Sequence, residues 1–489
     1  MSIVLIGFMG AGKSTAARAL AGADSDALVE AELGGSIEAF FDREGEAAFR
    51  EVEERVVCEL LDRGPDVVAL GGGAVLSERV REALGAHTVA LVEVDAETAW
   101  TRAARSNRPL ARDQDAFERR YSERLPLYES LADAFVPCVD AVAGVEALRE
   151  RPAGVRMVWA HAASGSYPVW FGEEAWPVPR GRTPQSGAFV LTDETVARLY
   201  ANRLGPVGMA IAPGEESKTL ASAQAVWEAL AAAGHTRSDT LLAVGGGVVG
   251  DLGGFCAATY QRGMPVVHVP TTVVAQVDSA YGGKTGVDLP QAKNYVGAYH
   301  QPAAVHVVPS TLETLPARER AAGYAEVVKT ALIAGGALWE SVRAGARDDS
   351  DTVLACARTK LRIVAADERD GGLRQVLNLG HTVAHALETV TGYSRLLHGE
   401  AVALGLLAAL RLSGQDALRD EVAELLAGAG LPLAVGGVDA AEVARATRMD
   451  KKRLGEAVPF VLVEAPGRVT PGHRVDDHDL LLAVQELLT

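Results

Sequence analysis

Short apolar runs alternate with charged helical stretches over the first 150 or so residues. Ile3–Ile6, Val67–Leu70 and Val89–Val94 have the length of buried strands, and Glu46–Asp62 has apolar residues at helical spacing. Strands that alternate with helices are typical of βαβ units around a parallel sheet. The pattern therefore predicts that the chain begins with an α/β domain.

A second α/β zone follows Arg151–Gly154, where a proline and a glycine are typical of a linker. Its predicted strands are Met157–Ala160, Val169–Gly172, Ala188–Leu191, Val207–Ile211, Leu241–Val244, Val266–Val269 and Ala304–Val308. From about Leu315 onward Ala, Leu, Glu and Arg recur at helical spacing, and strands become scarce until Val458–Val463. We therefore expect three domains, at residues 1–150, 151–315 and 316–489, of which the third is mostly helical.

Composition narrows the classes of function. The 489 residues carry a net charge of −17, which disfavours a protein that coats nucleic acid or an anionic membrane. Apolar residues make up 48%, but no run approaches the ~20 residues of a membrane span. The four cysteines are far apart and form no CxxC pair, and Met1–Ile6 lacks the basic region of a signal peptide. We expect a cytoplasmic protein with small-molecule partners.

Lysine is rare in this chain. Only eight of the 47 basic side chains are lysines, at positions Lys13, Lys218, Lys284, Lys293, Lys329, Lys360, Lys451 and Lys452. Surface lysines exchange for arginine at little cost, whereas a site that needs a compact ammonium does not accept a wide guanidinium. The lysines that remain are therefore candidates for anion-binding sites.

The segment Gly7–Thr15 matches GxxxxGK[ST] between a predicted strand and a predicted helix. Backbone N–H groups and a helix N-terminus bind phosphate there. Lys13 would reach the β- and γ-phosphates of ATP, and Ser14 would bind Mg²⁺. The residues predicted to hold the nucleotide are Gly10, Ala11, Gly12, Lys13, Ser14 and Thr15.

Polar segments follow this loop in a fixed order, namely Asp24–Asp26, Gly45–Arg50, Gly71–Gly73, Arg108–Leu110 and Arg124–Tyr128. Together with the phosphate loop they resemble shikimate kinase, over roughly residues 1–140. The fold implied is a P-loop kinase-like α/β/α domain. The sequence departs from the family in a shorter stretch between Lys13 and Asp26 and a trimmed segment between Arg108 and Arg124.

The resemblance implies a role for each matched residue. Asp26 would bind the shikimate hydroxyls and act as base, and Arg50 and Arg124 would hold the carboxylate. Gly72 would line the pocket, and Arg108 would close over ATP from a lid.

A second glycine motif, Gly245–Asp251, satisfies GxGxxG after the predicted strand Leu241–Val244. The acidic residue expected about 20 positions on is absent, since Asp278 is the next acid. The motif therefore predicts a nucleotide-contacting turn but not a standard dinucleotide fingerprint. Many Gly, Thr, Lys and Asp residues follow in what we interpret as ordered loops up to Asn294.

Three histidines cluster within 18 residues, at His381, His385 and His398. Two histidines with one carboxylate and an open position are typical of a catalytic zinc site. His381 and His385 stand at i and i+4 on one helix face, so spacing alone allows both as ligands.

Residues 155–489 as a whole resemble 3-dehydroquinate synthase, through Glu215–Lys218, Gly245–Phe255, Ala325–Lys329, Leu377–His385 and Leu397–Glu400. The resemblance implies an NAD-binding α/β domain followed by a helical metal-binding domain. The implied ligands of Zn²⁺, or of Co²⁺ in its place, are Glu326, His381 and His398. His385 would then contact substrate instead.

The resemblance also assigns the remaining site residues. The implied NAD contacts are Glu215, Lys218, Gly247, Val248, Val249, Gly250, Asp251, Thr271, Thr272, Lys284, Lys293, Thr311, Leu312, Glu313 and Thr314. The implied substrate contacts are Asp278, Lys284, Lys293, Asn294, Arg374 and one of Lys451 and Lys452, with Lys284, Lys329, Lys360, Asn378 and His385 as catalytic residues. Arg262 would reach the substrate phosphate of a neighbouring subunit, which implies a homodimer.

The implied activities are phosphorylation of shikimate by ATP and conversion of 3-deoxy-D-arabino-heptulosonate 7-phosphate to 3-dehydroquinate and phosphate. Two alternatives remain open at this point. The second part resembles other sugar phosphate cyclases that share NAD, zinc and most motifs. The alternative for the first part is a non-catalytic, nucleotide-binding module.

Overall fold

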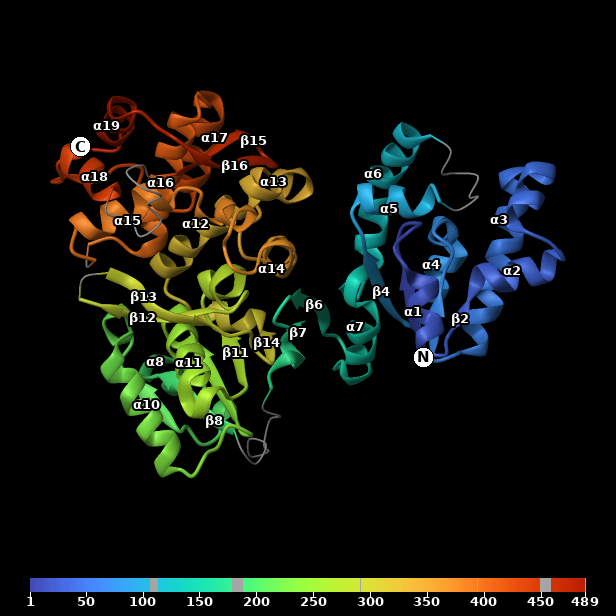
Figure 1. Ribbon diagram of the computed structural model, residues 1–489, viewed down its shortest axis with the longest axis horizontal. Coiled ribbons are helices and arrows are strands. Elements are labelled where there is room, and N and C mark those ends of the chain that lie inside the picture. Colours follow the sequence, from blue (N-terminus) through green and yellow to red (C-terminus); the bar gives the residue numbers. More distant parts are fainter. Residues whose placement is uncertain (106–112, 178–187, 291, 394, 449–458, 489) are drawn as a thin grey trace. The chain divides into compact units, whose positions relative to one another are not determined.

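The computed structural model describes residues 1–105, 113–177, 188–290, 292–393, 395–448 and 459–488. The chain forms two compact units, one of residues 1–161 and 168–170 and one of residues 162–167 and 171–489 (Figure 1). The α/β class predicted from the sequence is confirmed in both. The predicted domain limits at residues 150 and 315 stay predictions.

The first unit is built on a parallel sheet with the strand order β2-β3-β1-β4-β5-β6. The strands are β1 (Ile3–Ile6), β2 (Ala23–Asp24), β3 (Val67–Ala69), β4 (Thr88–Glu93), β5 (Ala134–Pro137) and β6 (Arg156–Ala162). The helices are α1 (Lys13–Ala19), α2 (Ser25–Leu33), α3 (Ile37–Arg63), α4 (Glu78–Leu84), α5 (Ala96–Ala103), α6 (Gln114–Leu131) and α7 (Ala141–Ala147). The central strand β1 is buried along its whole length, as expected for a parallel strand covered on both faces.

The short stretch between Lys13 and Asp26 is accommodated by a tight turn. Helix α1 ends at Ala19, and Ala21 takes the left-handed conformation with φ 55°. Gly22 then lies against β3, where a Cβ would stand 2.6 Å from the Val67 carbonyl oxygen. A return strand of only two residues, β2, is enough to bring the chain back to the sheet edge.

The second unit contains a parallel sheet with the order β14-β11-β10-β8-β9. Its strands are β8 (Ala188–Asp193), β9 (Met209–Ile211), β10 (Thr240–Gly245), β11 (Val266–Pro270) and β14 (Ala304–Val307). They are preceded by β7 (Gly165–Phe171), of which residues 168–170 count with the first unit. The helices of this part are α8 (Glu194–Leu199), α9 (Ala201–Leu204), α10 (Leu220–Ala232) and α11 (Gly247–Thr259). Leu191, Leu241 and Leu252 are fully buried in a core between strands and helices.

The rest of the second unit is mostly helical, as predicted. Its helices are α12 (Ala317–Ala334), α13 (Gly336–Arg343), α14 (Ser350–Ala366), α15 (His381–Val390), α16 (His398–Leu412), α17 (Asp416–Gly428), α18 (Ala440–Thr447) and α19 (Asp477–Gln485). Figure 1 shows these helices grouped with the hairpin of β15 (Phe460–Ala465) and β16 (Arg468–His473).

One interpretation of the sequence is wrong. The polar segment before Asn294 is not all loop, because β12 (Lys284–Leu289) and β13 (Ala292–Tyr299) form an antiparallel hairpin. Gly286 and Gly297 face each other across it, and a Cβ on Gly297 would lie 2.2 Å from the Thr285 carbonyl oxygen. Glycine and charged residues therefore interrupt the few β-branched residues of these strands, Thr285, Val287 and Val296, which weakens the usual sequence signal of a strand.

No helix in the described part of the chain combines the length and the apolar character needed to cross a membrane.

Candidate functional sites

The phosphate loop has the backbone that the motif requires. Gly7, Gly10 and Gly12 have φ of 139°, 85° and 90°, and a Cβ on Gly10 would meet the Ala99 carbonyl oxygen at 2.6 Å. Gly12 caps α1, so the N-terminus of this helix faces the loop. Lys13 is buried and donates to the carbonyl oxygens of Gly7 (2.7 Å) and Phe8 (3.1 Å). The ammonium is thus held inside the loop, where a phosphate would bind.

Side chains from three helices surround the glycine triplet Gly71–Gly73. A Cβ on Gly71 would lie 2.5 Å from Asp26 Oδ1, and a Cβ on Gly73 would lie 2.1 Å from Arg50 Nη1. Arg124 Nη1 donates to the Gly72 carbonyl oxygen at 3.5 Å. The structure therefore brings together Asp26, Arg50, Gly72 and Arg124, which are far apart in sequence. Arg108 lies outside the described residues.

Glu53 belongs to the same cluster, although no sequence motif pointed to it. Its carboxylate is 3% exposed and accepts a hydrogen bond from Arg50 Nη1 at 2.5 Å. Burial raises the pKa of Glu53, and the charges of Arg50 and Arg124 oppose this only in part. Glu53 stands one helical turn after Arg50, so it aligns the guanidinium that is predicted to hold a carboxylate.

The second glycine motif forms a tight turn from β10 into α11. A Cβ on Gly246 would lie 2.9 Å from the Thr272 side chain, and one on Gly247 would lie 3.2 Å from Ser279 Oγ. The first turn of α11 includes Gly247, Val248 and Val249, so three of the predicted dinucleotide contacts offer backbone N–H groups at a helix N-terminus. The Gly250 N–H donates to the Gly246 carbonyl oxygen at 3.1 Å. The predicted contacts Thr311–Thr314 lie in the 3₁₀ helix Pro309–Thr314, where Thr311 Oγ1 accepts a hydrogen bond from Gln276 at 2.9 Å.

A buried lysine links the two acids predicted to contact the dinucleotide. Lys218 Nζ lies 2.6 Å from Glu215, 3.3 Å from Asp251 and 3.9 Å from Asp288. Burial raises the pKa of Asp251 to about 6, although Lys218 opposes the shift. Burial also acts on Glu215, but Lys218 and Lys293 outweigh it and lower the pKa of that carboxyl.

Glycines let three helices approach closely at the predicted metal site. A Cβ on Gly399, at the start of α16, would stand 1.8 Å from the Ala322 carbonyl oxygen on α12. A Cβ on Gly405 would stand 2.0 Å from the carbonyl oxygen of Gly380, which caps α15. Because α12, α15 and α16 approach this closely, side chains from all three reach one point.

That point is occupied by Glu326, His381 and His398, one from each helix. Their ligand atoms all lie within 4.8 Å of one another. Glu326 Oε1 is 3.5 Å from His381 Nε2 and 3.4 Å from His398 Nε2. Tetrahedral N and O ligands about 2.0–2.1 Å from zinc stand roughly 3.4 Å apart, so the spacing fits a zinc or cobalt ion.

The charges of this group also fit a cation. Both carboxylate oxygens of Glu326 are buried and accept no well-formed hydrogen bond, although Lys329 Nζ lies 2.5 Å from Oε2. Burial opposes ionisation of Glu326, but Lys329 and the two histidines hold its pKa well below the ordinary value. Burial and Lys329 lower the pKa of His381 to about 4, so its imidazole is neutral, as a metal ligand must be. Burial opposes ionisation of His398, but Glu326 and Glu388 outweigh it and raise the pKa of His398 to about 10, so a metal ion would displace a proton from this histidine. The His398 side chain is 38% exposed, which leaves the group accessible on one side.

His385 is not part of this group among the residues that the structure describes. Its ring centroid lies 5.4 Å from that of His381 and 6.3 Å from that of His398. The i, i+4 spacing correctly puts His381 and His385 on one helix face, but the two other ligand positions are taken by Glu326 and His398 from other helices. The role of His385 toward substrate stays a prediction.

Beside this group, Asp278 lies between two buried lysines. Lys329 Nζ donates to Asp278 Oδ2 at 3.2 Å, and Lys360 Nζ donates to the Asp278 carbonyl oxygen at 2.6 Å and also contacts Oδ1. Asp278 stands in a π-helical turn, Ala275–Ser279, a geometry that is frequent at functional sites. Burial opposes ionisation of Asp278, but the two ammonium groups outweigh it and lower its pKa.

The two lysines differ in their proton affinity. Burial lowers the pKa of each, but Lys329 faces both Asp278 and Glu326, which together raise its pKa above the ordinary value. Lys360 has Asp278 alone, with Arg374 and Lys329 nearby, and its pKa is lowered. The charge of Asp278 alone does not offset the cost of burying the Lys360 ammonium, whereas Lys329 has Glu326 as a second partner. Lys360 is therefore the lysine that releases its proton more readily.

The other predicted substrate residues have varied surroundings. Lys284 pairs with Asp370 at 2.5 Å, and Lys293 pairs with Glu388 at 3.3 Å. Arg374 is 1% exposed and donates to the carbonyl oxygens of Glu368 and Gly282, the latter at 3.0 Å. Its guanidinium therefore connects the backbones of two loops through hydrogen bonds.

Three predicted site residues have an unusual backbone conformation or stand at the end of a helix. Asn294 and Arg262 have φ of 51° and 71°, which non-glycine residues seldom adopt and which is enriched at functional sites. Asn378 ends the 3₁₀ helix Leu373–Asn378, two residues before the cap of α15. Lys451 and Lys452 lie outside the described residues.

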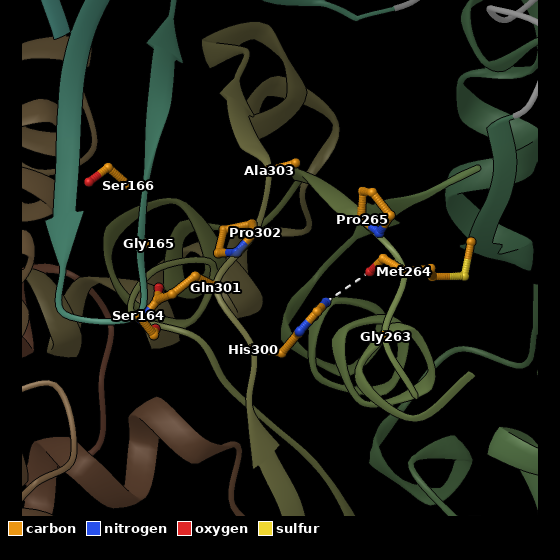
Figure 2. Close-up of a pocket in the computed structure, with 10 residues that line it drawn as sticks. All are labelled: Ser164, Gly165, Ser166, Gly263, Met264, Pro265, His300, Gln301, Pro302 and Ala303. Atoms are coloured by element: carbon orange, nitrogen blue, oxygen red, sulfur yellow. Dashed lines mark hydrogen bonds between the residues drawn. The ribbon is translucent and has the colours of Figure 1, made fainter. Parts of the chain in front are cut away.

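An open pocket of about 410 Å³ lies elsewhere in the second unit. Figure 2 shows that the turn Ser164–Ser166, the segment Gly263–Pro265 and the segment His300–Ala303 line it, with His300 Nε2 2.9 Å from the Met264 carbonyl oxygen. None of the predicted catalytic or ligand-binding residues lines this pocket. The converging charged groups, rather than this cavity, mark the candidate site.

Comparisons with known protein families agree with this geometry. Residues 208–322 match the family model of the 3-dehydroquinate synthase N-terminal domain, and residues 323–453 match that of its C-terminal domain. Residues 9–144 match the shikimate kinase family model. The chain thus matches both families in which the sequence placed it.

Individual relatives support the synthase assignment. The 3-dehydroquinate synthase of Halorhodospira halophila is 42% identical over 334 residues, which cover 64% of this chain and 94% of the relative. That of Geobacter metallireducens is 43% identical over 296 residues, covering 56% and 82%.

A solved structure of 2-deoxy-scyllo-inosose synthase with carbaglucose-6-phosphate, NAD⁺ and Co²⁺ is 26% identical, with a TM-score of 0.60. The match covers 68% of this chain and all of that chain. The chain belongs to the 3-dehydroquinate synthase family and carries a shikimate kinase domain ahead of the synthase.

Proposed function

We propose that the chain catalyses two reactions of aromatic amino acid biosynthesis at separate sites. The first unit transfers a phosphoryl group from ATP to shikimate. The second unit converts 3-deoxy-D-arabino-heptulosonate 7-phosphate to 3-dehydroquinate and phosphate, with NAD and a divalent metal. The observation that carries the proposal is the meeting of Glu326, His381 and His398 beside the Lys329–Asp278–Lys360 cluster.

In the kinase unit, the phosphate loop binds the nucleotide and Lys13 neutralises its phosphates, with Mg²⁺ held through Ser14. Arg50, aligned by Glu53, and Arg124 hold the shikimate carboxylate. Asp26, on the other side of the glycine triplet, accepts the proton of the attacking hydroxyl. Positioning and charge neutralisation are the main sources of rate in phosphoryl transfer, and these residues supply both.

In the synthase unit, a bound metal ion would polarise a substrate oxygen, and NAD would accept a hydride and return it. The residues of the chain bind the acidic substrate and move protons. Lys329 stays charged between two carboxylates and neutralises developing negative charge. Lys360, whose pKa is lowered by burial, is suited to exchange a proton with substrate. Lys284 and Lys293 add positive charge for the phosphate.

The proposal includes a homodimer, in which Arg262 reaches the phosphate at the partner's site. The left-handed backbone of Arg262 supports an unusual projection of this side chain. A cytoplasmic location, expected from the sequence, is part of the same proposal.

The kinase activity is tested by coupling ADP formation to phosphorylated shikimate with purified chain, ATP and Mg²⁺. We expect ADP and product in equal amounts, and at least a hundredfold loss in the Asp26→Asn variant. ATP binding without shikimate-dependent turnover above this variant would leave the first unit a nucleotide-binding module only.

The synthase activity is tested on the same preparation by phosphate release from the heptulosonate. We expect release to stop after metal is removed with a chelator, and to return with added Zn²⁺ or Co²⁺. Release that survives complete metal removal would disprove the metal assignment. The kinase reaction, measured after the chelator is removed and Mg²⁺ is restored, serves as the internal control for an intact protein.

A further inference from the structure

Glu388 is a buried acid that the predicted site does not use. It stands near the end of α15, seven residues after His381, and its side chain is 2% exposed. Its Oε1 lies 3.4 Å from His398 Nδ1 and 3.3 Å from Lys293 Nζ. One carboxylate oxygen thus contacts both a metal-site histidine and a lysine that is proposed to add charge for the substrate phosphate.

The contact with His398 determines which ring nitrogen carries the proton. His398 Nε2 faces Glu326 Oε1 at 3.4 Å, on the side where the three ligand atoms converge. Its Nδ1 faces Glu388 on the opposite side of the ring. A carboxylate accepts a hydrogen bond from Nδ1–H, so the lone pair of a neutral imidazole is left on Nε2, toward the metal position.

The contact with Lys293 fixes a side chain that comes from a strand, β13, and not from the helices that carry the metal ligands. Lys293 projects from β13, with Glu388 at 3.3 Å and Glu215 at 3.9 Å. Its ammonium also lies 4.8 Å from the ring centroid of Tyr393, a residue held at φ 59° just after α15. Glu388 is the closest of these groups to the Lys293 ammonium, and it comes from the helix that carries His381.

We propose that Glu388 is a positioning residue that orients the metal ligand His398 and, through the same oxygen, places the Lys293 ammonium beside the metal site. The inference rests on the proposed function of the second unit and extends it to a residue outside the predicted set. Because both partners donate to one oxygen, any shift of the metal ligand changes the position of the lysine as well. Metal binding and phosphate binding are coupled through this one side chain.

The decisive variant is Glu388→Gln, which keeps the size of the side chain but removes its charge. We expect the metal-free protein to bind Zn²⁺ 10- to 100-fold more weakly, the usual effect of removing the partner of a metal-bound histidine. The dissociation constant is measured by competition with a chromophoric chelator on metal-free protein, so no turnover is needed. At saturating Zn²⁺, we also expect a higher KM for the heptulosonate phosphate, because Lys293 loses its nearest partner.

A matched control separates this role from general stability. Glu486→Gln also removes a carboxylate that bridges two cations, Arg411 at 2.9 Å and Arg419 at 2.5 Å, at an exposed place in the same unit. We expect wild-type zinc affinity in this control. A Glu388→Gln protein with unchanged melting temperature and a zinc dissociation constant within twofold of wild type would overturn the inference while leaving the metal site itself intact.

If Glu388→Gln does not fold, Glu388→Asp replaces it, since the charge stays but the carboxylate retracts by one methylene. Wild-type zinc affinity in Glu388→Asp would overturn the positioning role, and a weaker affinity in a folded protein would support it. Failure of the wild-type chain to bind Zn²⁺ would disprove the proposed metal site as well as this inference.

Discussion

Replacing Gly399 by alanine tests how the three helices build the metal site. The added Cβ would lie 1.8 Å from the carbonyl oxygen of Ala322, whereas Cβ atoms are essentially never found within 3.0 Å of a heavy atom outside their own and the adjacent residues. The start of α16 must therefore move by at least about 1.2 Å from α12. Gly399 follows His398 directly, so the movement acts on a metal ligand.

The size of the effect follows from this displacement. Metal–ligand distances tolerate only about ±0.2 Å, and even the loss of a hydrogen-bond partner of a ligand typically costs about 10- to 100-fold in metal affinity. We expect zinc affinity to fall at least about a hundredfold, roughly 2.8 kcal/mol. The overpacking itself should cost ~1–3 kcal/mol of stability, which lowers the melting temperature without unfolding the unit.

The assay is chelator competition on metal-free protein, with circular dichroism to show that the helices persist. Gly428→Ala is the matched control, because Gly428 also lies in a helix of this unit and its Cβ would meet only one atom, Arg347 Nη2 at 4.0 Å. Its zinc affinity should equal that of wild type. Wild-type affinity in a folded Gly399→Ala protein would refute the view that this helix contact sets the ligand spacing.

Three further changes test other parts of the account. Lys329→Arg inserts a wider cation into a site that is 1% exposed, so phosphate release should fall at least a hundredfold; half of wild-type activity would contradict the need for an ammonium there. Burial lowers the pKa of His268 from 6.5 to about 4. Between these pH values the unfolded chain binds a proton at His268 and the folded chain does not, so up to about 3 kcal/mol of stability is lost as pH falls from 6.5 to 4. His268→Leu should therefore flatten the acid dependence of the melting temperature, and an unchanged slope, equal to that of the exposed-site control His478→Gln, would contradict this. Glu53→Gln leaves Arg50 without its buried partner and should raise the KM for shikimate at least about tenfold, with ATP binding unchanged as the control; an unaltered KM would exclude the alignment role.

The lysines show how much of the candidate sites could be predicted from the sequence alone. Because lysine is rare here, each one is conspicuous in the sequence, and Lys13, Lys218, Lys329 and Lys360 are all buried among polar groups. The long motifs around them were specific enough to predict both families and the α/β architecture. Composition was informative because the chain uses arginine for its ordinary surface charge.

The acidic partners of these lysines were not predictable in the same way. The chain has 64 acidic residues, so Glu53, Asp370 and Glu388 carry no compositional signal. Lys284 meets Asp370 86 residues later and Lys293 meets Glu388 95 residues later, contacts that only the folded helices and hairpin create. The β12–β13 hairpin was also missed from the sequence, because the facing pair Gly286–Gly297 and several charged residues interrupt its β-branched positions.

Two independent active sites on one chain are the central claim, and crossed single-site variants test it most directly. Both reactions are measured on wild type, Lys13→Met and His381→Ala under identical conditions. We predict that Lys13→Met loses only shikimate phosphorylation and that His381→Ala loses only metal-dependent formation of 3-dehydroquinate, each by at least about a hundredfold. Loss of both reactions in one folded variant, or of neither in both variants, would contradict the account.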